Sequence, residues 1–195
     1  MRNLLMIPLI GGLLLASSQA DEKSQIAQIR KWYGEVENNK ALKKTSYKTN
    51  EDETPHVGGL TRYETKAGEL KKLIHDSYGE HGSSTVMFYF NNGKLFFVYE
   101  FTEEWRFTGE ETAEGQSKTV TIGREYRYYF HNGKCIRALS KTVQTGDGGK
   151  VRKLLQKAKN ELMAHHDTAP NLLRQAEAFS KMKSAEELEK YFSEP

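Results

Sequence analysis

Cysteine is almost absent from this chain of 195 residues, in which Cys135 is the only one. A single cysteine cannot form an internal disulfide, so the stability of the fold must come from packing alone. Cys135 lies among apolar residues of a repeated segment, which favours a role as a small core residue. A role as a nucleophile would need a base that is brought from elsewhere in the fold.

The short motifs of common catalytic and nucleotide-binding sites are also missing. The sequence contains no Gly-x-Ser-x-Gly elbow, no Gly-x-Gly-x-x-Gly fingerprint, no Walker loop, no His-Glu-x-x-His and no Cys-x-x-Cys. The sequence therefore assigns no catalytic residue, no cofactor and no metal ligand. Whether the protein is an enzyme stays open, and the missing motifs favour a protein without catalytic activity.

Long apolar runs are confined to the N-terminus. The run Leu4–Leu15 follows Arg2 and is too short to anchor a protein stably across a bilayer, while Ser18 and Ala20 supply the small residues of a cleavage site. Residues 1–20 are therefore predicted to be a signal peptide. We expect an exported protein, periplasmic or secreted, with no stable membrane anchor after cleavage; an uncleaved anchor is the alternative.

The chain also lacks a strong charge of either sign. Its net charge is +3, from 29 Lys and Arg against 26 Asp and Glu. Such a balance gives at most a mild preference for anionic partners, and an exported location argues against nucleic acid. The expected partner is another protein or a small-molecule ligand.

Aromatic residues are abundant, and many of them flank glycine turns. Phe88–Glu100 reads FYFNNGKLFFVYE, in which Asn92-Gly93 is the strongest short-range signal for a β-hairpin with a two-residue turn. This register places Phe90 opposite Leu95, Phe88 opposite Phe97 and Tyr89 opposite Phe96. Both faces of the hairpin are then apolar, as in a sheet that is covered on both sides. A bulge would shift the register.

The same phrase recurs along the chain. Tyr128–Lys134 repeats Phe88–Lys94, and Tyr63–Leu70 is a weaker third copy. Three hairpins predict an antiparallel sheet of about six strands, with approximate bounds of 58–65, 69–76, 84–90, 94–107, 118–130 and 134–145. Ser46–Lys48 is a further candidate for a short strand.

Helical patterns flank this sheet. Ser24–Lys40 is predicted to be a helix that packs on it through a stripe of apolar residues, namely Ile26, Ile29, Tyr33 and Val36. A second helix is expected from Lys150 to near His165. Thr168 is expected to cap a third helix that reaches Lys181, and Ser184–Glu187 is a capping box that opens a last helix.

The fold class that follows is α+β. Its parts are the signal peptide at 1–20, a domain of one helix and an antiparallel sheet at 21–147, and a helical C-terminal segment at 148–195. The C-terminal helices either pack on the sheet or form an appendage.

A signal peptide, a short helix and a repeated Tyr-Phe-x-Asn-Gly-Lys hairpin resemble a loose group of exported bacterial proteins of unknown function. The hairpins also resemble MORN-type β-hairpin repeats faintly, but they lack the glycine spacing of a true MORN unit. The resemblance covers about 58–145 and implies a fold. It transfers no lipid-binding or tethering role and no site residues.

One strand segment combines aromatic and basic side chains. The candidate binding surface consists of Tyr126, Tyr128, Tyr129, Arg127 and Arg137. Such a surface can stack on rings or sugars, although Tyr and Arg also cover sheet faces with their apolar bodies.

Histidines and carboxylates supply the remaining candidates. His165-His166-Asp167 has the residue types of a metal or proton-transfer site, but adjacent helical side chains point about 100° apart. His75-Asp76 falls on a strand, where neighbours face opposite sides. The acidic loop 108–117 is either a solvated tip or a site for a cation or a basic partner.

The function that these patterns favour is a non-catalytic, exported binding or interaction module that uses a sheet face or hairpin tips. One alternative is a small exported hydrolase whose histidines and carboxylates meet only in the fold. Another is a protein inhibitor that presents a hairpin loop to a secreted enzyme.

Overall fold

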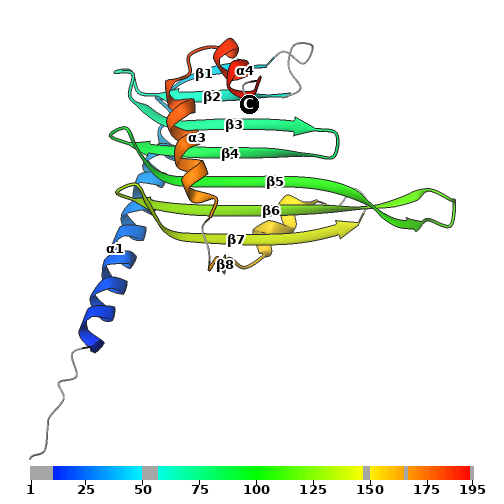
Figure 1. The fold of residues 1–195 in the computed structure, drawn as a ribbon, viewed down its shortest axis with the longest axis horizontal. Helices are drawn as coiled ribbons and strands as arrows, with labels where there is room; N and C mark the ends of the chain where they lie inside the picture. Colours follow the sequence, from blue (N-terminus) through cyan, green and yellow to red (C-terminus); the bar gives the residue numbers. More distant parts are fainter. Residues whose placement is uncertain (1–10, 50–56, 147–149, 165–166, 194–195) are drawn as a thin grey trace, which may run out of the picture.

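A computed structural model describes residues 11–49, 57–146, 150–164 and 167–193. Its strands form one antiparallel sheet in which the order across the sheet follows the order along the chain (Figure 1). The strands are β1 (Lys43–Lys48), β2 (Val57–Glu64), β3 (Leu70–Gly79), β4 (Gly82–Asn91), β5 (Lys94–Glu111), β6 (Ser117–His131), β7 (Lys134–Gly146) and β8 (Glu161–Leu162). The helices are α1 (Gly11–Asn38), α2 (Val151–Lys157), α3 (Ala169–Lys181) and α4 (Ala185–Ser193).

The α+β class is confirmed, whereas the prediction of about six strands was wrong because the sheet has eight. Strands β2 to β7 lie at the six predicted segments. The two further strands lie at the edges and carry little apolar pattern; β1 contains the short strand suggested at Ser46–Lys48, and β8 was not predicted. β1 reads KKTSYK and pairs only with β2, and β8 pairs through two residues with Leu139 and Ser140 of β7.

The two Asn-Gly turns adopt the predicted conformation. Asn92 and Gly93 have φ values of 49° and 71°, and Asn132 and Gly133 have 48° and 73°, as a two-residue hairpin turn requires. Asn92 and Asn132 are the only residues other than glycine with positive φ in the described part of the chain.

A bulge changes the predicted register beyond the first pair. Phe90 does lie opposite Leu95, but Tyr89 pairs with Phe97, so the predicted pairs of Phe88 with Phe97 and Tyr89 with Phe96 were wrong. Phe96 is the extra residue of the bulge, and its ring packs edge-on against Trp32 of α1 at 5.5 Å. The second hairpin has the same shift after Phe130 and Cys135.

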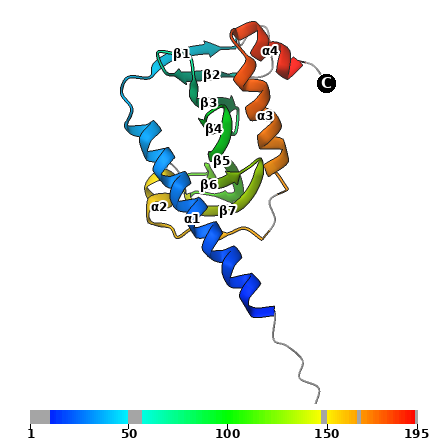
Figure 2. The ribbon, with the colours of Figure 1, turned by 90° about the vertical axis from the view of Figure 1, so that its left-hand side faces the viewer.

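Helices cover both faces of the sheet, with α1 and α3 on opposite sides (Figure 2). The larger core lies under α3 and α4 and includes Leu60, Leu73, Phe88, Val98, Tyr128, Leu172, Phe179 and Leu188. The core under α1 includes Ile26, Ile29, Tyr89, Phe97 and Tyr129. Helix α2 adds Val151 and Leu155 against Phe101. The C-terminal helices thus pack on the sheet.

Helix α1 begins earlier than predicted, at Gly11 instead of Ser24. Residues 13–33 contain neither Gly nor Pro, so nothing in this stretch interrupts the helix. Residues 1–10 of the predicted signal peptide lie outside the described part of the chain. None of the helices within the described ranges is both long enough and apolar enough to cross a bilayer.

Helix α2 ends at Lys157, so the predicted helix to His165 was too long. Ala158 is extended, with φ −68° and ψ 144°, and the chain then turns into β8. His165 and His166 lie outside the described residues. The last two helices lie where they were predicted, and the Glu187 N–H donates to Ser184 Oγ at 3.3 Å as in a capping box. Thr168 precedes α3 as predicted, but its side chain makes no cap hydrogen bond and donates to the Tyr128 hydroxyl instead.

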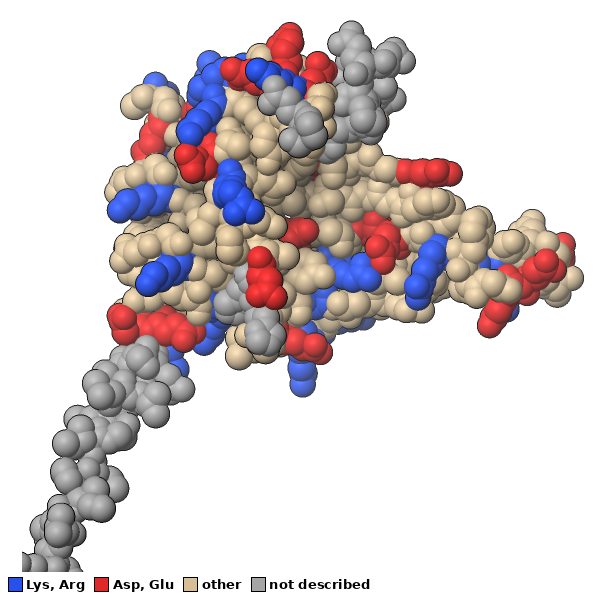
Figure 3. Space-filling view, in the orientation of Figure 1, with Lys and Arg blue, Asp and Glu red and all other residues tan. Residues whose placement is uncertain are grey.

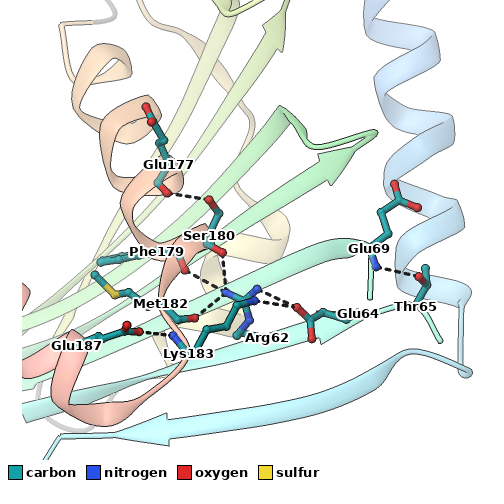
Figure 4. A network of polar contacts seen from close by, with 10 residues as sticks. All are labelled: Arg62, Glu64, Thr65, Glu69, Glu177, Phe179, Ser180, Met182, Lys183 and Glu187. Carbon is teal, nitrogen blue, oxygen red and sulfur yellow. Dashed lines mark hydrogen bonds and ion pairs between the residues drawn. The ribbon is translucent and has the colours of Figure 1, made fainter. Parts of the chain in front are cut away.

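A buried arginine fixes the corner between α3 and α4 (Figure 4). Arg62 of β2 is 2% exposed, and its Nη1 donates to the carbonyl oxygens of Phe179, Ser180 and Met182 at 3.0–3.1 Å. Its Nη2 donates to Glu64 Oε1 at 2.8 Å. The guanidinium therefore occupies the carbonyl end of α3, where positive charge is favoured.

Candidate interaction surface

The structure divides the five candidate residues between the two faces of the sheet. Side chains alternate along β6, so Tyr126 and Tyr128 face α3, whereas Arg127 and Tyr129 face α1. Arg137 of β7 lies opposite Tyr129. The five side chains therefore do not share one surface.

All five take part in packing or pairing within the protein: Tyr129 is buried against Phe97, and Arg127 pairs with Glu125. Tyr128 is buried, and its hydroxyl accepts a hydrogen bond from Thr168 Oγ1 at 3.1 Å. Tyr126 stacks beside Tyr128. Arg137 forms an ion pair with Glu22 of α1 at 2.8 Å. Arg127 and Tyr129 line a cleft beneath α1.

The histidines that the structure describes lie apart from one another. His75 of β3 is buried between the rings of Phe179 and Phe192, at 4.9 and 5.4 Å. His81 lies in the turn between β3 and β4, and His131 lies beside the Asn-Gly turn at the other end of the sheet. Among the described residues no group of three His, Cys, Asp or Glu could hold a metal ion.

Cys135 is half-buried at the edge of the larger core. Burial raises the pKa of its thiol, although the thiol's hydrogen bonds with backbone groups act the other way. A raised pKa leaves less of the reactive thiolate at neutral pH, which agrees with a packing role.

Strands β5 and β6 extend beyond their neighbours at one end of the sheet. β4 begins at Gly82, opposite Glu104, and β7 ends at Gly146, opposite Val120. Residues 105–119, here called the arm, therefore form a two-stranded ribbon that projects from the body (Figure 1). The acidic loop 108–117 predicted from the sequence forms most of it.

Hydrogen bonds close the tip of the arm. The Thr112 N–H donates to the Gln116 carbonyl at 2.7 Å, and Thr112 Oγ1 accepts from the N–H groups of Glu114 and Gln116 at 3.3 and 3.2 Å. Gly115 has a φ of 77°, which a residue with a side chain rarely adopts. The tip is thus a defined loop.

One face of the arm carries two aromatic rings, of which Trp105 is half-buried and Phe107 is exposed. Glu103, Trp105 and Phe107 alternate along β5 and point to the same side as Phe101. The rings of Trp105 and Phe107 are nearly perpendicular, with centroids 5.3 Å apart, and His81 packs edge-on against Trp105 at 4.6 Å. Phe107 is 59% exposed.

These side chains line an open cavity of about 430 Å³, here called the aromatic trough. Its lining consists of Gly82, Ser83, Glu103, Trp105, Phe107, Thr119 and Thr121. Glu103 is the only charged residue among them. A carboxylate beside two rings at right angles suits a cation, because the ring faces and the carboxylate both attract positive charge.

The rest of the arm is rich in acidic side chains. Glu110, Glu111 and Glu114 are exposed near its end, where Figure 3 shows acidic groups gathered. Lys118 pairs with Glu110 at 3.1 Å, and Arg124 pairs with Glu104 at 2.8 Å. The arm itself, residues 105–119, has three glutamates against Arg106 and Lys118, a net charge of −1, and Glu103 and Glu104 just before it bring the charge of 103–119 to −3.

Sequence reasoning foresaw the acidic tip but missed the trough. Trp105 and Phe107 have the same alternating pattern as the buried part of β5. They stay uncovered because β4, β7 and α2 do not extend over them. The sequence around Trp105 does not show where those three elements end.

Comparisons with known proteins found no family model, no curated protein and no solved structure that matches the chain. The resemblance to exported proteins with repeated hairpins therefore stays a prediction. The function has to be argued from the surfaces of the protein itself.

Proposed function

We propose that the protein is a non-catalytic, exported interaction module whose arm binds an extended, basic segment of a partner polypeptide. The observation that carries this proposal is the pair of adjacent rings, half-buried Trp105 and exposed Phe107, beside the carboxylate of Glu103 on a projecting ribbon. Export follows from the signal peptide predicted at residues 1–20 and is part of the proposal.

Exposed rings on the arm add little to folding. An isolated two-stranded hairpin is at best marginally stable in water, and rings that stay in water contribute little of the hydrophobic stabilisation that buried rings give. Tryptophan and other aromatic side chains contribute strongly once a partner covers them, and Trp is enriched among the residues that dominate binding energy. The trough thus has the properties of an interface.

The charge of the surface supports a basic occupant. A lysine or arginine side chain can lie over a ring face and reach the Glu103 carboxylate, and cation–π contacts of this kind contribute about 0.5–2 kcal/mol. The acidic side chains between Glu103 and Ser117 also speed the approach of a basic partner.

The backbone of the arm supports an extended occupant. The Trp105 N–H of β5 still donates to the His81 carbonyl at 2.8 Å; beyond Trp105 strand β5 pairs only with β6, and before Val120 strand β6 pairs only with β5. The outer edge of each strand can therefore accept an added strand, whose alternate side chains would enter the trough. A protein inhibitor that presents this arm to a secreted enzyme is a narrower form of the same proposal, and the closed tip loop supports it.

The proposal can be tested by titrating the full chain against a labelled peptide of alternating lysine and threonine and following fluorescence anisotropy. Trp105→Ala and Glu103→Gln should each weaken binding about tenfold, or ~1.4 kcal/mol. A peptide with glutamine in place of lysine should bind much more weakly than the basic one.

Glu35→Gln on α1 is the matched control, because it removes the same charge from an exposed site outside the trough. If Glu35→Gln and Glu103→Gln had the same effect, or if Trp105→Ala left the affinity unchanged, the trough would not be the binding site.

A further inference from the structure

A second cavity lies under α1, away from the trough, and has a volume of about 220 Å³. Three rings from β5 and β6 form its floor, namely Phe97, Tyr99 and Tyr129. Ile29 and Tyr33 of α1 form a wall. Arg30 and Arg127 bring positive charge to this otherwise apolar lining. It is here called the α1 cleft.

A buried carboxylate lies beside the floor of the cleft. Glu125 is buried, and its Oε1 forms an ion pair with Arg127 and lies 3.6 Å from Lys141 Nζ. The Tyr99 hydroxyl donates to Glu125 Oε2 at 3.0 Å, and Lys141 Nζ also donates to the Leu155 carbonyl at 2.9 Å. One carboxylate therefore faces two cations, which leaves a net positive charge beside the cleft.

The other charged side chains around the α1 cleft do not cancel this net positive charge. Arg30 is exposed on α1, and the guanidinium of Arg152 lies over the ring of Phe101 at 3.7 Å. On the helix side the charge of Glu37 acts on Tyr33, and Lys72 already pairs with Glu37 at 2.6 Å. Arg127 is held in place by Glu125 and by the side chain of Asn160.

We propose that the α1 cleft binds a small amphipathic anion, a carboxylate carried on a single aromatic ring. The ring would lie on Phe97 and Tyr129, and the carboxylate would lie between Arg30 and Arg127. An arginine fork matches a carboxylate in two hydrogen bonds. The cleft is smaller than the usual pockets for drug-sized ligands, about 300–1,000 Å³, so one ring fits better than a larger body.

Tyr99 contributes a neutral floor. Burial, followed by the charge and hydrogen bond of Glu125, raises the pKa of Tyr99 to about 12. Its hydroxyl therefore stays protonated at neutral pH and adds no negative charge that would repel the ligand. This site goes beyond the partner binding proposed for the arm, because it has its own ligand chemistry and shares no residue with the trough.

Three probes with the same ring separate charge from shape. The full chain is titrated by ligand-observed NMR with phenylacetate, with phenylacetamide as its neutral analogue and with phenethylammonium as its cationic analogue. Phenylacetate should bind at least about tenfold more tightly than phenylacetamide, and the cation should bind most weakly. Equal affinities of the three probes, or no binding of phenylacetate, would overturn the proposal.

Single substitutions then test whether the ligand binds in the α1 cleft. Arg30→Gln should weaken phenylacetate about tenfold and leave phenylacetamide unchanged, and Arg30→Lys should restore part of the loss. Tyr33→Ala should weaken the acid and the amide together, because it removes a wall. Arg106→Gln, an exposed arginine on the arm, is the control and should change nothing. Equal effects of Arg30→Gln and Arg106→Gln would contradict the site, whatever the arm binds.

Discussion

Strand β5 has two halves in opposite environments. From Lys94 to Phe101 it lies between β4 and β6, and Phe96, Phe97, Val98 and Phe101 are buried. From Trp105 to Glu111 it has only β6 beside it, and none of its residues is buried. Both halves alternate aromatic residues, so the pattern alone does not decide burial. The elements that lie over each half decide it.

The turn that ends the body hairpin and the loop that ends the arm also differ. The body hairpin ends in the two-residue Asn92-Gly93 turn, which sets the register of strands buried on both faces. The arm ends in a polar loop that Thr112 closes with hydrogen bonds. The body thus uses its rings for stability, whereas we infer that the arm keeps its rings for a partner.

The largest expected effect comes from removing one aromatic ring from the body and one from the arm. Phe88 is 0% exposed, so Phe88→Ala should lower the free energy of unfolding by about 4 kcal/mol. Phe107→Ala should lower it by less than about 0.5 kcal/mol, since the ring already lies in water. Chemical denaturation measures both values. Similar losses for the two variants would contradict the division between body and arm.

Arg62 tests whether the body also depends on a buried polar group. Arg62→Met should lower the free energy of unfolding by about 3 kcal/mol, because it leaves three carbonyl groups of the α3–α4 corner without their donor and leaves Glu64 with Lys183 alone. Arg174→Met on the exposed side of α3 is the control and should change little. A loss no larger than that of the control would show that the corner does not need the guanidinium.

The two kinds of turn allow a smaller test. Gly93→Ala in the body turn should lower the free energy of unfolding by about 1 kcal/mol, because its φ of 71° is unfavourable for a residue with a Cβ. Gly115→Ala at the tip has the same local strain but should shift the global unfolding midpoint much less, since the arm can open without the body. Thermal unfolding of the two variants compares them directly.

The smallest expected effect is a pH dependence within the body. Burial raises the pKa of Glu100, so the folded protein favours its protonated form. Its contribution to stability is then highest at acid pH and declines as pH rises from the unfolded pKa, near 4.5, through the raised folded pKa. Glu100→Gln should remove this decline and make the protein slightly more stable at pH 7.

Glu64 provides the opposite sign for the same measurement. Burial alone would raise its pKa, but the hydrogen bonds and charges of Arg62 and Lys183 together lower it. Its contribution is present above the unfolded pKa and is lost as pH falls through the lowered folded pKa. Near neutral pH, Glu64→Gln should therefore lower the unfolding midpoint relative to the unchanged protein, whereas Glu100→Gln should raise it. Parallel curves would contradict the assigned environments.

Local patterns explain how much of the fold could be predicted. The Asn-Gly turns and the alternation of strands β2 to β7 depend on neighbours in the sequence, and they were predicted correctly. The sequence allowed for a bulge in the first hairpin but did not place it at Phe96, whose ring packs on Trp32 of α1. Of polar β1 only Ser46–Lys48 was suggested, and short β8 was missed, because the pairing of both strands depends on their partners.

The candidate site was harder to predict for the same reason. Tyr128 and Tyr129 are adjacent on a strand and so face opposite sides, which separates the aromatic and basic group into two surfaces. Arg62 meets the end of α3 across a separation of 117 residues, and no local signal shows this contact. The trough exists because β4, β7 and α2 end where they do.

Hydrogen exchange along β5 tests the central claim most directly. In the free protein, amides of the arm at 105–111 should exchange much faster than those of the body at 95–101, because the arm lacks covering elements. Adding the basic lysine-threonine peptide should slow exchange in the arm and leave the body unchanged. Equal protection of the two halves in the free protein, or an arm that the peptide does not protect, would contradict the account.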